Sequence, residues 1–349
     1  MPGASVRHDA HDRPAAPRRA LVTGGAGFIG SHLCEHLLAR GDHVTAVDNL
    51  STGRRANLPA DHPRLRFIEA ELSDFLHAIG RVGGGERFDQ IYHLAAAVGV
   101  KLVMDEPIRA IETNVIQASS LLTFALTHGP DGRPAPTLLA SSSEVYGKSD
   151  KSPFHEDDDV VYGPTTKGRW AYACSKALDE HLALAHHQRN GLPAVIARFF
   201  NISGPRQVGA YGMVLPRFVA AALRGDDLEV HGDGKQTRCF VDIRDVIPSL
   251  PRLVESPACH GRVFNIGSDQ PISMRSLAQQ VIDTISSKSA IRMVPYDQVY
   301  AAGFEDLRQR QPDLTRIREA IGFRPRIGLE ETIRDLAAMM RDQPSERVP

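Results

Sequence analysis

The fold follows from one stretch of the chain, Ala20-Leu21-Val22-Thr23-Gly24-Gly25-Ala26-Gly27-Phe28-Ile29-Gly30, and from residues 31–38 after it. The stretch is typical of a short apolar strand, a tight turn and an amphipathic helix with leucines on one face. Gly24 would allow the turn, Gly27 would let the backbone approach a pyrophosphate, and Gly30 would let the helix lie close to the sheet. The free N–H groups where the helix begins favour an anion there. An ordinary strand–turn–helix without a ligand remains the alternative, because many turns are rich in glycine.

A second apolar segment, His43-Val44-Thr45-Ala46-Val47-Asp48, favours the ligand-binding interpretation. It reads as a strand that ends in a carboxylate, roughly 20 residues after the glycine turn, where an acid holds a ribose 2′-hydroxyl in dinucleotide-binding proteins. Asp48 at that place would repel a 2′-phosphate. We therefore predict that the cofactor is NAD and not NADP.

Composition limits the classes of function. The chain has 349 residues, which suits one large or two modest domains, and its 41 lysines and arginines are balanced by 42 aspartates and glutamates. No basic stripe is visible, which argues against a nucleic-acid partner. No apolar run approaches the roughly 18 residues of a membrane span, so we expect no membrane partner. Residues 1–17 lack periodicity and an apolar core, so we predict a flexible tail and not a secretory signal.

The cysteines carry a prediction about the compartment. Cys34, Cys174, Cys239 and Cys259 are far apart in the sequence and match no metal-ligand spacing. We interpret all four as reduced thiols of a cytoplasmic protein, and we predict no metal site.

Strands and helices alternate from residue 18 to about residue 200, which predicts an α/β fold with a Rossmann-type, doubly wound parallel sheet. We expect strands at 19–23, 43–48, 65–69, 89–94, 136–141 and 193–198, and helices at 28–40, 106–128 and 168–190. After residue 200 proline and glycine become frequent and the expected helices shorten. We therefore predict an NAD-binding domain at 18–200 and a smaller, partly discontinuous C-terminal substrate domain at 201–238 and 269–345. Residues 239–268 should rejoin the first domain through strands near 238–243 and 261–266.

Two further segments could carry chemistry. Tyr172 and Lys176 are four residues apart on an expected helix, so they share one face. A nearby ammonium and an oxidised nicotinamide would both favour the phenolate and lower the tyrosine pKa from about 10 toward neutrality. The alternative is an ordinary solvated helix face. The segment Ser141-Ser142-Ser143-Glu144 follows an expected buried strand, at the edge where sites form. Its serines could instead satisfy loop backbone groups.

In their order and spacing these motifs resemble the extended short-chain dehydrogenase/reductase family, in particular its NAD-dependent nucleotide-sugar epimerases, dehydratases and decarboxylases. The resemblance extends from about residue 19 to residue 340. Further matching segments are 48–53, 93–96, Asn114, 198–201 and 234–240.

The resemblance implies a role for each matching residue. Ser142 would be the serine of the catalytic triad, Tyr172 the base, and Lys176 the residue that binds the nicotinamide ribose and lowers the tyrosine pKa. Cofactor contacts are implied for Gly24, Gly27, Phe28, Ile29, Gly30, Asp48, Asn49, Ser51, Thr52, Gly53, Glu71, Leu72, Leu94, Ala95, Ala96, Asn114, Tyr172 and Lys176. Substrate contacts are implied for Ser142, Asn201, Arg206, Gln236, Arg238 and Arg310. The family also implies a homodimer that pairs through helices 106–128 and 168–190.

The pair Ser143-Glu144 indicates which reaction the chain performs. UDP-glucuronate decarboxylases carry Ser-Glu after the triad residue, whereas dTDP-glucose dehydratases carry Asp-Glu and galactose-type 4-epimerases usually carry small or uncharged residues. Arg310 aligns with an arginine of the decarboxylases. The resemblance therefore implies a UDP-glucuronate decarboxylase that gives UDP-4-keto-pentose or UDP-xylose, with Ser143, Glu144 and Arg310 as catalytic residues.

Three other functions stay open at this point. The first is a UDP-glucuronate or UDP-hexose 4-epimerase. The run Ala95–Lys101 differs from the usual decarboxylase loop that meets the sugar, so the identity of the sugar also stays open. The second is a sugar-nucleotide 4,6-dehydratase, since GDP-mannose dehydratases also carry Ser-Glu. The third is a catalytically silent NAD sensor, against which the retained Tyr172 and Lys176 argue.

Overall fold

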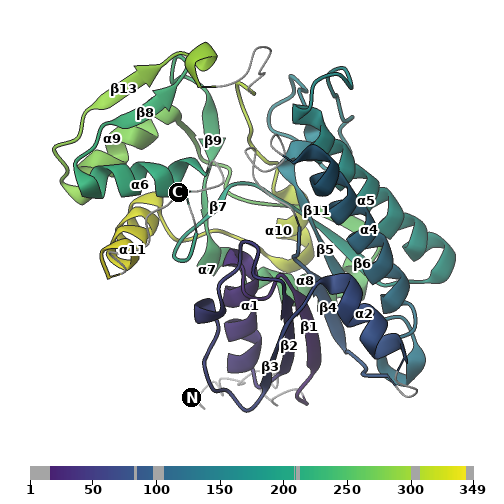
Figure 1. Ribbon diagram of the computed structural model, residues 1–349. Coiled ribbons are helices and arrows are strands. Elements are labelled where there is room, and N and C mark those ends of the chain that lie inside the picture. Colours follow the sequence, from purple (N-terminus) through teal and green to yellow (C-terminus); the bar gives the residue numbers. More distant parts are fainter. Residues whose placement is uncertain are drawn as a thin grey trace, which may run out of the picture.

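A parallel sheet of seven strands forms the centre of the protein in the computed structural model (Figure 1), which describes residues 16–81, 85–96, 106–207, 209, 213–299 and 307–342. Its strand order is β11-β6-β5-β4-β1-β2-β3, which contains the strand order of a doubly wound dinucleotide-binding sheet. The strands are β1 (Arg19–Thr23), β2 (His43–Asp48), β3 (Leu65–Glu69), β4 (Gln90–His93), β5 (Thr137–Ser142), β6 (Ala194–Phe199) and β11 (Arg262–Ile266).

Helices cover both faces of this sheet because neighbouring residues of a strand point to opposite faces. On one face, Ala20 and Val22 of β1 pack in a core with α1 (Phe28–Ala39), α7 (Ile243–Val246), α8 (Ser249–Glu255) and α10 (Thr315–Ile321). On the other face, Leu21 packs in a core with α2 (Leu72–Arg81), α4 (Pro107–Ala125) and α5 (Arg169–Asn190). The parallel strands therefore end at one shared edge, where ligands bind in such sheets.

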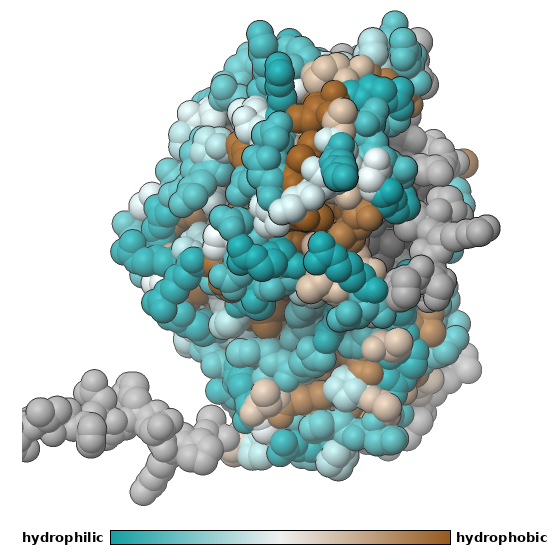
Figure 2. Space-filling view, turned by 90° about the vertical axis from the view of Figure 1, so that its left-hand side faces the viewer, coloured by the Kyte–Doolittle hydropathy of each residue, from teal (hydrophilic) through white to brown (hydrophobic). Residues whose placement is uncertain are grey.

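A separate core lies beside the sheet and contains α6 (Val214–Arg224), α9 (Met274–Ile285) and α11 (Leu329–Asp342). These helices pack with the parallel pair β8 (Leu228–His231) and β13 (Ile291–Val294), at the upper left of Figure 1. Two short pairs lie outside the main sheet: β7 (Ile202–Ser203) with β10 (Val241–Asp242), and β9 (Thr237–Cys239) with β12 (Pro271–Ser273). The 3-10 helices are η1 (Arg55–Asn57), η2 (Pro130–Gly132), η3 (Ser143–Tyr146), η5 (Pro257–Cys259) and η6 (Tyr296–Gln298). Figure 2 views the molecule from the left-hand side of Figure 1. The surface there is largely hydrophilic, and hydrophobic residues gather along a strip in its upper half.

The predicted fold class is confirmed, and each strand and helix predicted between residues 18 and 200 has both bounds within three residues of an observed one. The sequence analysis missed α2, although Leu72, Phe75, Leu76 and Ile79 repeat there at helical spacing. The strand expected near 238–243 is split into β9 and β10, which pair with β12 and β7 outside the main sheet, while Val241 and Ile243 pack in the core of the first domain.

The domain division stays a prediction, with two structural facts that bear on it. Strand β11 lies in the main sheet, as expected for residues 239–268. Helix α10, grouped by its sequence position with the second domain, packs through Ile317 onto the core of the first. Residues 1–15 of the expected tail and residues 97–101 of the unusual loop lie outside the described residues. Within the described residues, no helix has the length and apolar character that crossing a membrane requires.

Candidate active site

The glycine turn between β1 and α1 forms a cradle at the shared edge of the sheet. Gly24 adopts a φ of 68° and donates its N–H to the carbonyl of Val47 over 2.8 Å. A β-carbon on Gly30 would overlap the carbonyl oxygen of Gly24, so α1 reaches the turn only because residue 30 is glycine. Gly27 is the N-cap residue of α1 and offers no side chain to the first N–H groups of the helix. The N–H groups of the half-buried Phe28 and Ile29 therefore lack helical acceptors, as at any helix start. This cradle fits a pyrophosphate.

Asp48 lies beside this cradle at the end of β2. Its carboxylate accepts the N–H of Ala26 over 3.0 Å and that of Leu50 over 2.8 Å. Burial raises the pKa of Asp48, although these backbone hydrogen bonds oppose the shift. A β-carbon on Gly53 would lie 2.8 Å from the Asp48 carboxylate, so this glycine lets the loop close over the acid.

The other expected cofactor residues surround the same edge. Ser51 and Thr52 lie in the loop that Gly53 closes. The side chain of Asn49 donates to that of Glu71 over 2.9 Å, and the next residue, Leu72, is buried. Leu94, Ala95 and Ala96 follow β4, where the N–H of Leu94 donates to the carbonyl of Thr23 over 3.2 Å. Asn114, buried on α4, donates to Ser175 of α5 over 3.3 Å. The described residues therefore fit a dinucleotide laid across the strand ends.

Ser142 and Tyr172 meet at the end of β5. The Ser142 hydroxyl accepts the N–H of Glu144 over 3.2 Å, and a hydrogen bond between Ser142 and Tyr172 favours the phenolate. Burial and the charge of Glu144 nevertheless raise the pKa of Tyr172 above its ordinary value. Burial is the largest cause of this shift, so the lowered tyrosine pKa that the sequence analysis expects would require the positive charge of a bound cofactor. The Lys176 ammonium donates to Asp179 over 2.9 Å.

Glu144 is held by two arginines from distant parts of the chain. Arg310 pairs with one carboxylate oxygen and Arg169 of α5 pairs with the other over 3.3 Å. Burial alone would raise the pKa of Glu144, but the charges of Arg310 and Arg169 lower it to about 2. Ser143, directly before Glu144, is buried. Two guanidinium groups around a carboxylate are the arrangement that recognises a carboxylate or a phosphate.

The expected substrate residues fall into two places. Arg238 contributes to the positive field at Glu144 and donates to the carbonyl of Leu307 over 2.8 Å. Asn201 donates to the carbonyl of Cys239 over 3.0 Å, one residue beyond Arg238. Arg206, in contrast, lies against α1, where its guanidinium donates to Ser31 over 3.2 Å and pairs with Glu35 over 2.6 Å.

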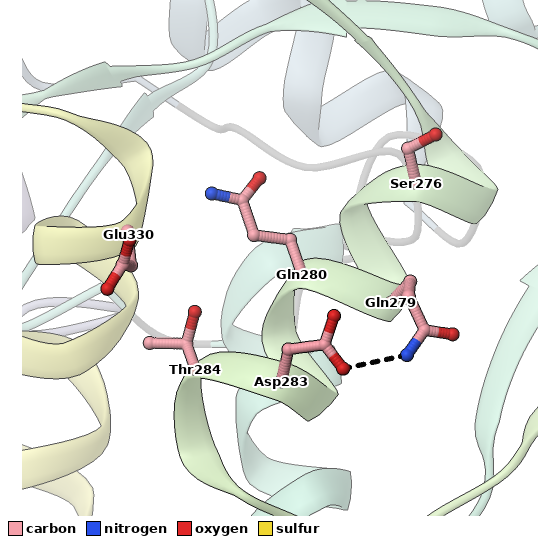
Figure 3. Close-up of a pocket in the computed structure, with 6 residues that line it drawn as sticks. All are labelled: Ser276, Gln279, Gln280, Asp283, Thr284 and Glu330. Atoms are coloured by element: carbon pink, nitrogen blue, oxygen red, sulfur yellow. Dashed lines mark hydrogen bonds between the residues drawn. The ribbon is translucent and has the colours of Figure 1, made fainter.

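Gln236 lines a cavity of about 300 Å³ near Arg238, and its side chain donates to the carbonyl of His231 over 2.9 Å. The lining residues of this cavity are Gly232, Asp233, Gln236, Tyr296, Leu307 and Arg308. A larger hollow between α9 and α11 is lined by polar surface residues (Figure 3), where Gln279 donates to Asp283 over 2.9 Å. It lies on the surface of α9 and α11, and none of its lining residues is a predicted site residue, so it is not the candidate site.

The sequence analysis missed Arg169 and Asp179. Arg169 lies three residues before Tyr172 and Asp179 lies three residues after Lys176, so both share the helix face of the predicted pair. Helical spacing was therefore a signal that could have identified them.

Comparison with known proteins identifies a family and several similar enzymes. The model of the GDP-mannose 4,6 dehydratase family matches residues 21–336. A UDP-N-acetyl-alpha-D-glucosaminuronate decarboxylase of Bacillus cytotoxicus is 40% identical over 328 residues, which cover 93% of this chain and 98% of that protein. UDP-glucuronic acid decarboxylase 4 of Arabidopsis thaliana is 35% identical, over 93% of this chain and 68% of that protein. The structure of Thermus thermophilus UDP-glucose 4-epimerase in complex with NAD superimposes with a TM-score of 0.78 at 28% identity, over 93% of this chain and 99% of that chain.

Proposed function

We propose that this chain, which belongs to the GDP-mannose 4,6-dehydratase family of NAD-dependent nucleotide-sugar enzymes, decarboxylates a UDP-linked hexuronate. The observation that carries the proposal is the pair of guanidinium groups, Arg169 and Arg310, around the Glu144 carboxylate near Tyr172. A site with this charge attracts a sugar that carries its own carboxylate at carbon 5. UDP-glucuronate and its 2-acetamido analogue are the two candidate substrates, in keeping with the names of the similar decarboxylases.

The first step is oxidation of the sugar at carbon 4. Bound NAD would accept the hydride from that carbon. We assign Tyr172 as the base that takes the proton of the 4-hydroxyl, and Ser142, its hydrogen-bond partner, as the group that orients this hydroxyl. Lys176 would hold the nicotinamide ribose on the same helix face. The charge of the oxidised nicotinamide would offset the groups that raise the pKa of Tyr172.

The second step is loss of the carboxylate. Once carbon 4 is a ketone, the carboxylate on carbon 5 belongs to a β-keto acid. The bond from carbon 5 to the carboxyl carbon then breaks, carbon dioxide leaves, and the electron pair forms an enolate on the ketone oxygen. We assign Arg310 to the carboxylate and the enolate charge. Because Glu144 has a pKa of about 2 and is ionised at neutral pH, we assign it, with Ser143, to a water that returns a proton to carbon 5.

The remaining features fit the same function. We assign the glycine cradle and Asp48 to the binding of NAD. We assign the cavity next to Gln236 and Arg238 to the binding of the substrate's nucleotide. We propose a homodimer formed through α4 and α5, supported by apolar side chains that these helices expose at Ile108, Ile116 and Leu178. We propose a cytoplasmic location, supported by four cysteines that all carry free thiols.

The test is incubation of the full chain and NAD with each hexuronate nucleotide, labelled in the carboxyl carbon, with trapping of carbon dioxide. Release of label supports the proposal, with either of two products. One is the 4-keto-pentose nucleotide, when the hydride stays on the cofactor, and the other is the pentose nucleotide, when the reduced cofactor would return the hydride to carbon 4. Formation of a 4-epimer without release of label would establish instead the 4-epimerase, the function that the neighbouring epimerase fold favours. Arg310→Gln should abolish the release of label, whereas Arg334→Gln, on the exposed face of α11, should not change it.

A further inference from the structure

The segment that follows Arg310 is held by a loop from a distant part of the chain. The N–H of Phe154 donates to the carbonyl of Gln311 over 2.8 Å, and the N–H of Asp313 donates to the carbonyl of Phe154 over 2.8 Å. Phe154 and Pro312 are therefore paired like residues of neighbouring parallel strands. Because this pairing begins one residue after Arg310, it fixes the place where that side chain leaves the backbone.

The side chain of Asn265, on β11, connects this pairing to η3. It is fully buried, and its Nδ2 donates to the carbonyl of Phe154 over 3.0 Å and to that of Asp313 over 3.3 Å. Its Oδ1 accepts the hydroxyl of Tyr146, the last residue of η3, over 2.7 Å. One amide group therefore joins three segments that are far apart in the sequence.

This position uses the whole hydrogen-bonding capacity of an asparagine. A neutral amide has an oxygen that accepts and a nitrogen that donates twice, and here the oxygen meets a hydroxyl while the nitrogen meets two carbonyls. The backbone N–H of Asn265 adds a bond to the Glu156 carboxylate, in the same loop as Phe154, over 2.9 Å. A side chain of similar shape without the NH₂ group would leave buried carbonyls unpaired, which is costly.

Aromatic packing connects the same segments. The rings of Tyr146 and Phe154 stack with their centroids 4.6 Å apart and their planes 5° from parallel. Tyr146 lies in η3, the 3-10 helix that also carries Glu144, the partner of Arg310. Both members of this ion pair therefore extend from backbone that is fixed to one buried cluster, and the Asn265 amide lies at the junction.

We propose that Asn265 is a positioning residue that sets the place of the Arg310 guanidinium relative to Glu144. It acts through the backbone on the two sides of the ion pair. This inference rests on the proposed function, in which Arg310 serves the loss of the carboxylate. Removal of the amide should therefore slow the release of carbon dioxide more than the oxidation at carbon 4, for which Tyr172 is the assigned base.

The experiment is a single turnover of the full chain, saturated with NAD, on each hexuronate nucleotide labelled in the carboxyl carbon. Absorbance of NADH reports the first step, and trapped carbon dioxide reports the second. Asn265→Leu keeps the approximate shape of the side chain and removes its three hydrogen bonds, whereas Tyr146→Phe removes one. The matched control is Leu253→Ala in α8, which weakens the sheet's core near the opposite edge, where Glu255 pairs with Arg18 before β1.

The two steps should respond differently to the loss of the amide. In Asn265→Leu the release of carbon dioxide should slow by about tenfold or more, while the formation of NADH stays within a factor of about three, because misalignment penalises the step in which the displaced group acts. Tyr146→Phe should give the same pattern with a smaller effect, and the control should leave both rates unchanged. An equal slowing of both steps, or an unchanged release, would overturn the proposal. If Asn265→Leu does not fold, the comparison in Tyr146→Phe decides.

Urea unfolding at pH 7 tests the same connection without a sugar. Glu144→Gln should lower the urea midpoint less in Asn265→Leu than in the wild type, because the ion pair with Arg310 is then already weakened. In the Arg310→Gln background this dependence on Asn265 should disappear. A loss that does not depend on Asn265, or a dependence that persists without Arg310, would overturn the proposal. Failure of the wild type to release carbon dioxide would instead refute the proposed decarboxylation, and the unfolding comparison would then decide the role of Asn265 by itself.

Discussion

Replacing Glu144 with glutamine should destabilise the protein, because it removes the shared partner of two buried guanidinium groups. The Glu144 side chain is 16% exposed and is paired with Arg310 and Arg169. These arginines hold its pKa at about 2, against an ordinary value of 4.5. The gap between the two values corresponds to on the order of 3 kcal/mol in favour of the ionised side chain in the folded state. Glu144→Gln should lower the free energy of unfolding at pH 7 by about this amount.

The assay is urea unfolding of the wild type and Glu144→Gln from pH 7 downward. Because the folded pKa lies below the unfolded one, the stabilisation is complete above about pH 4.5 and is lost as the pH falls toward 2. The difference between the two proteins should therefore be constant near neutrality and narrow in acid. Glu330→Gln, which breaks an exposed pair with Arg334, should cost less than about 1 kcal/mol.

The Arg310→Gln variant separates the contributions of the two arginines to the stability. In Arg310→Gln, the further change Glu144→Gln should cost less than in the wild type, because only Arg169 then loses its partner. Equal stability of Glu144→Gln and the wild type at pH 7 would refute the argument, as would a difference that is the same at pH 7 and pH 3.

Three further changes test other parts of the molecule. Gly30→Ala should cost about 3 kcal/mol and abolish NAD binding, measured by calorimetry, because its β-carbon overlaps the glycine turn. Gly80→Ala, with open space around the same atom, should change stability by less than about 1 kcal/mol; a similar cost in both would contradict the cradle. Tyr172→Phe should leave NAD affinity within a factor of about two while NADH formation from the substrate, followed by absorbance, disappears; residual formation at the wild-type rate would exclude Tyr172 as the base. Glu180→Gln should cost about 3 kcal/mol or more by urea unfolding, because it leaves a buried guanidinium unpaired; a cost near zero would show that the ion pair is not structural.

Local signals account for what the sequence predicts well. The glycine turn, the alternation of strands and helices, and the Tyr172–Lys176 spacing all depend on residues close in the chain, and the sheet order confirms the fold that they indicate. The contact between Glu144 and Arg310 joins residues 166 positions apart. The resemblance indicated both residues, but periodicity alone could not show that they meet.

Other contacts between residues far apart in the chain cannot be predicted from local sequence patterns for the same reason. A substrate contact of Arg206 stays a prediction, and in the structure its guanidinium binds Ser31 and Glu35 on α1, 171 residues from the latter. An arginine presents the same residue type whether it meets a phosphate or a glutamate. Only the path of the chain decides between them.

The precision of the site depends on how α5 is fixed to the sheet. Arg169, Tyr172, Lys176 and Asp179 follow one another at spacings of three and four, so they form one stripe along the helix. A rotation or slide of α5 would displace all four together. Glu180, adjacent to the stripe, binds Ser141 of β5 and Arg198 of β6 through buried hydrogen bonds. These bonds join the helix to the two strands beside which the sugar is proposed to react, so a residue outside the site sets the distance between base and substrate. Loss of this pair should therefore lower kcat more than it raises KM, since it changes alignment more than binding.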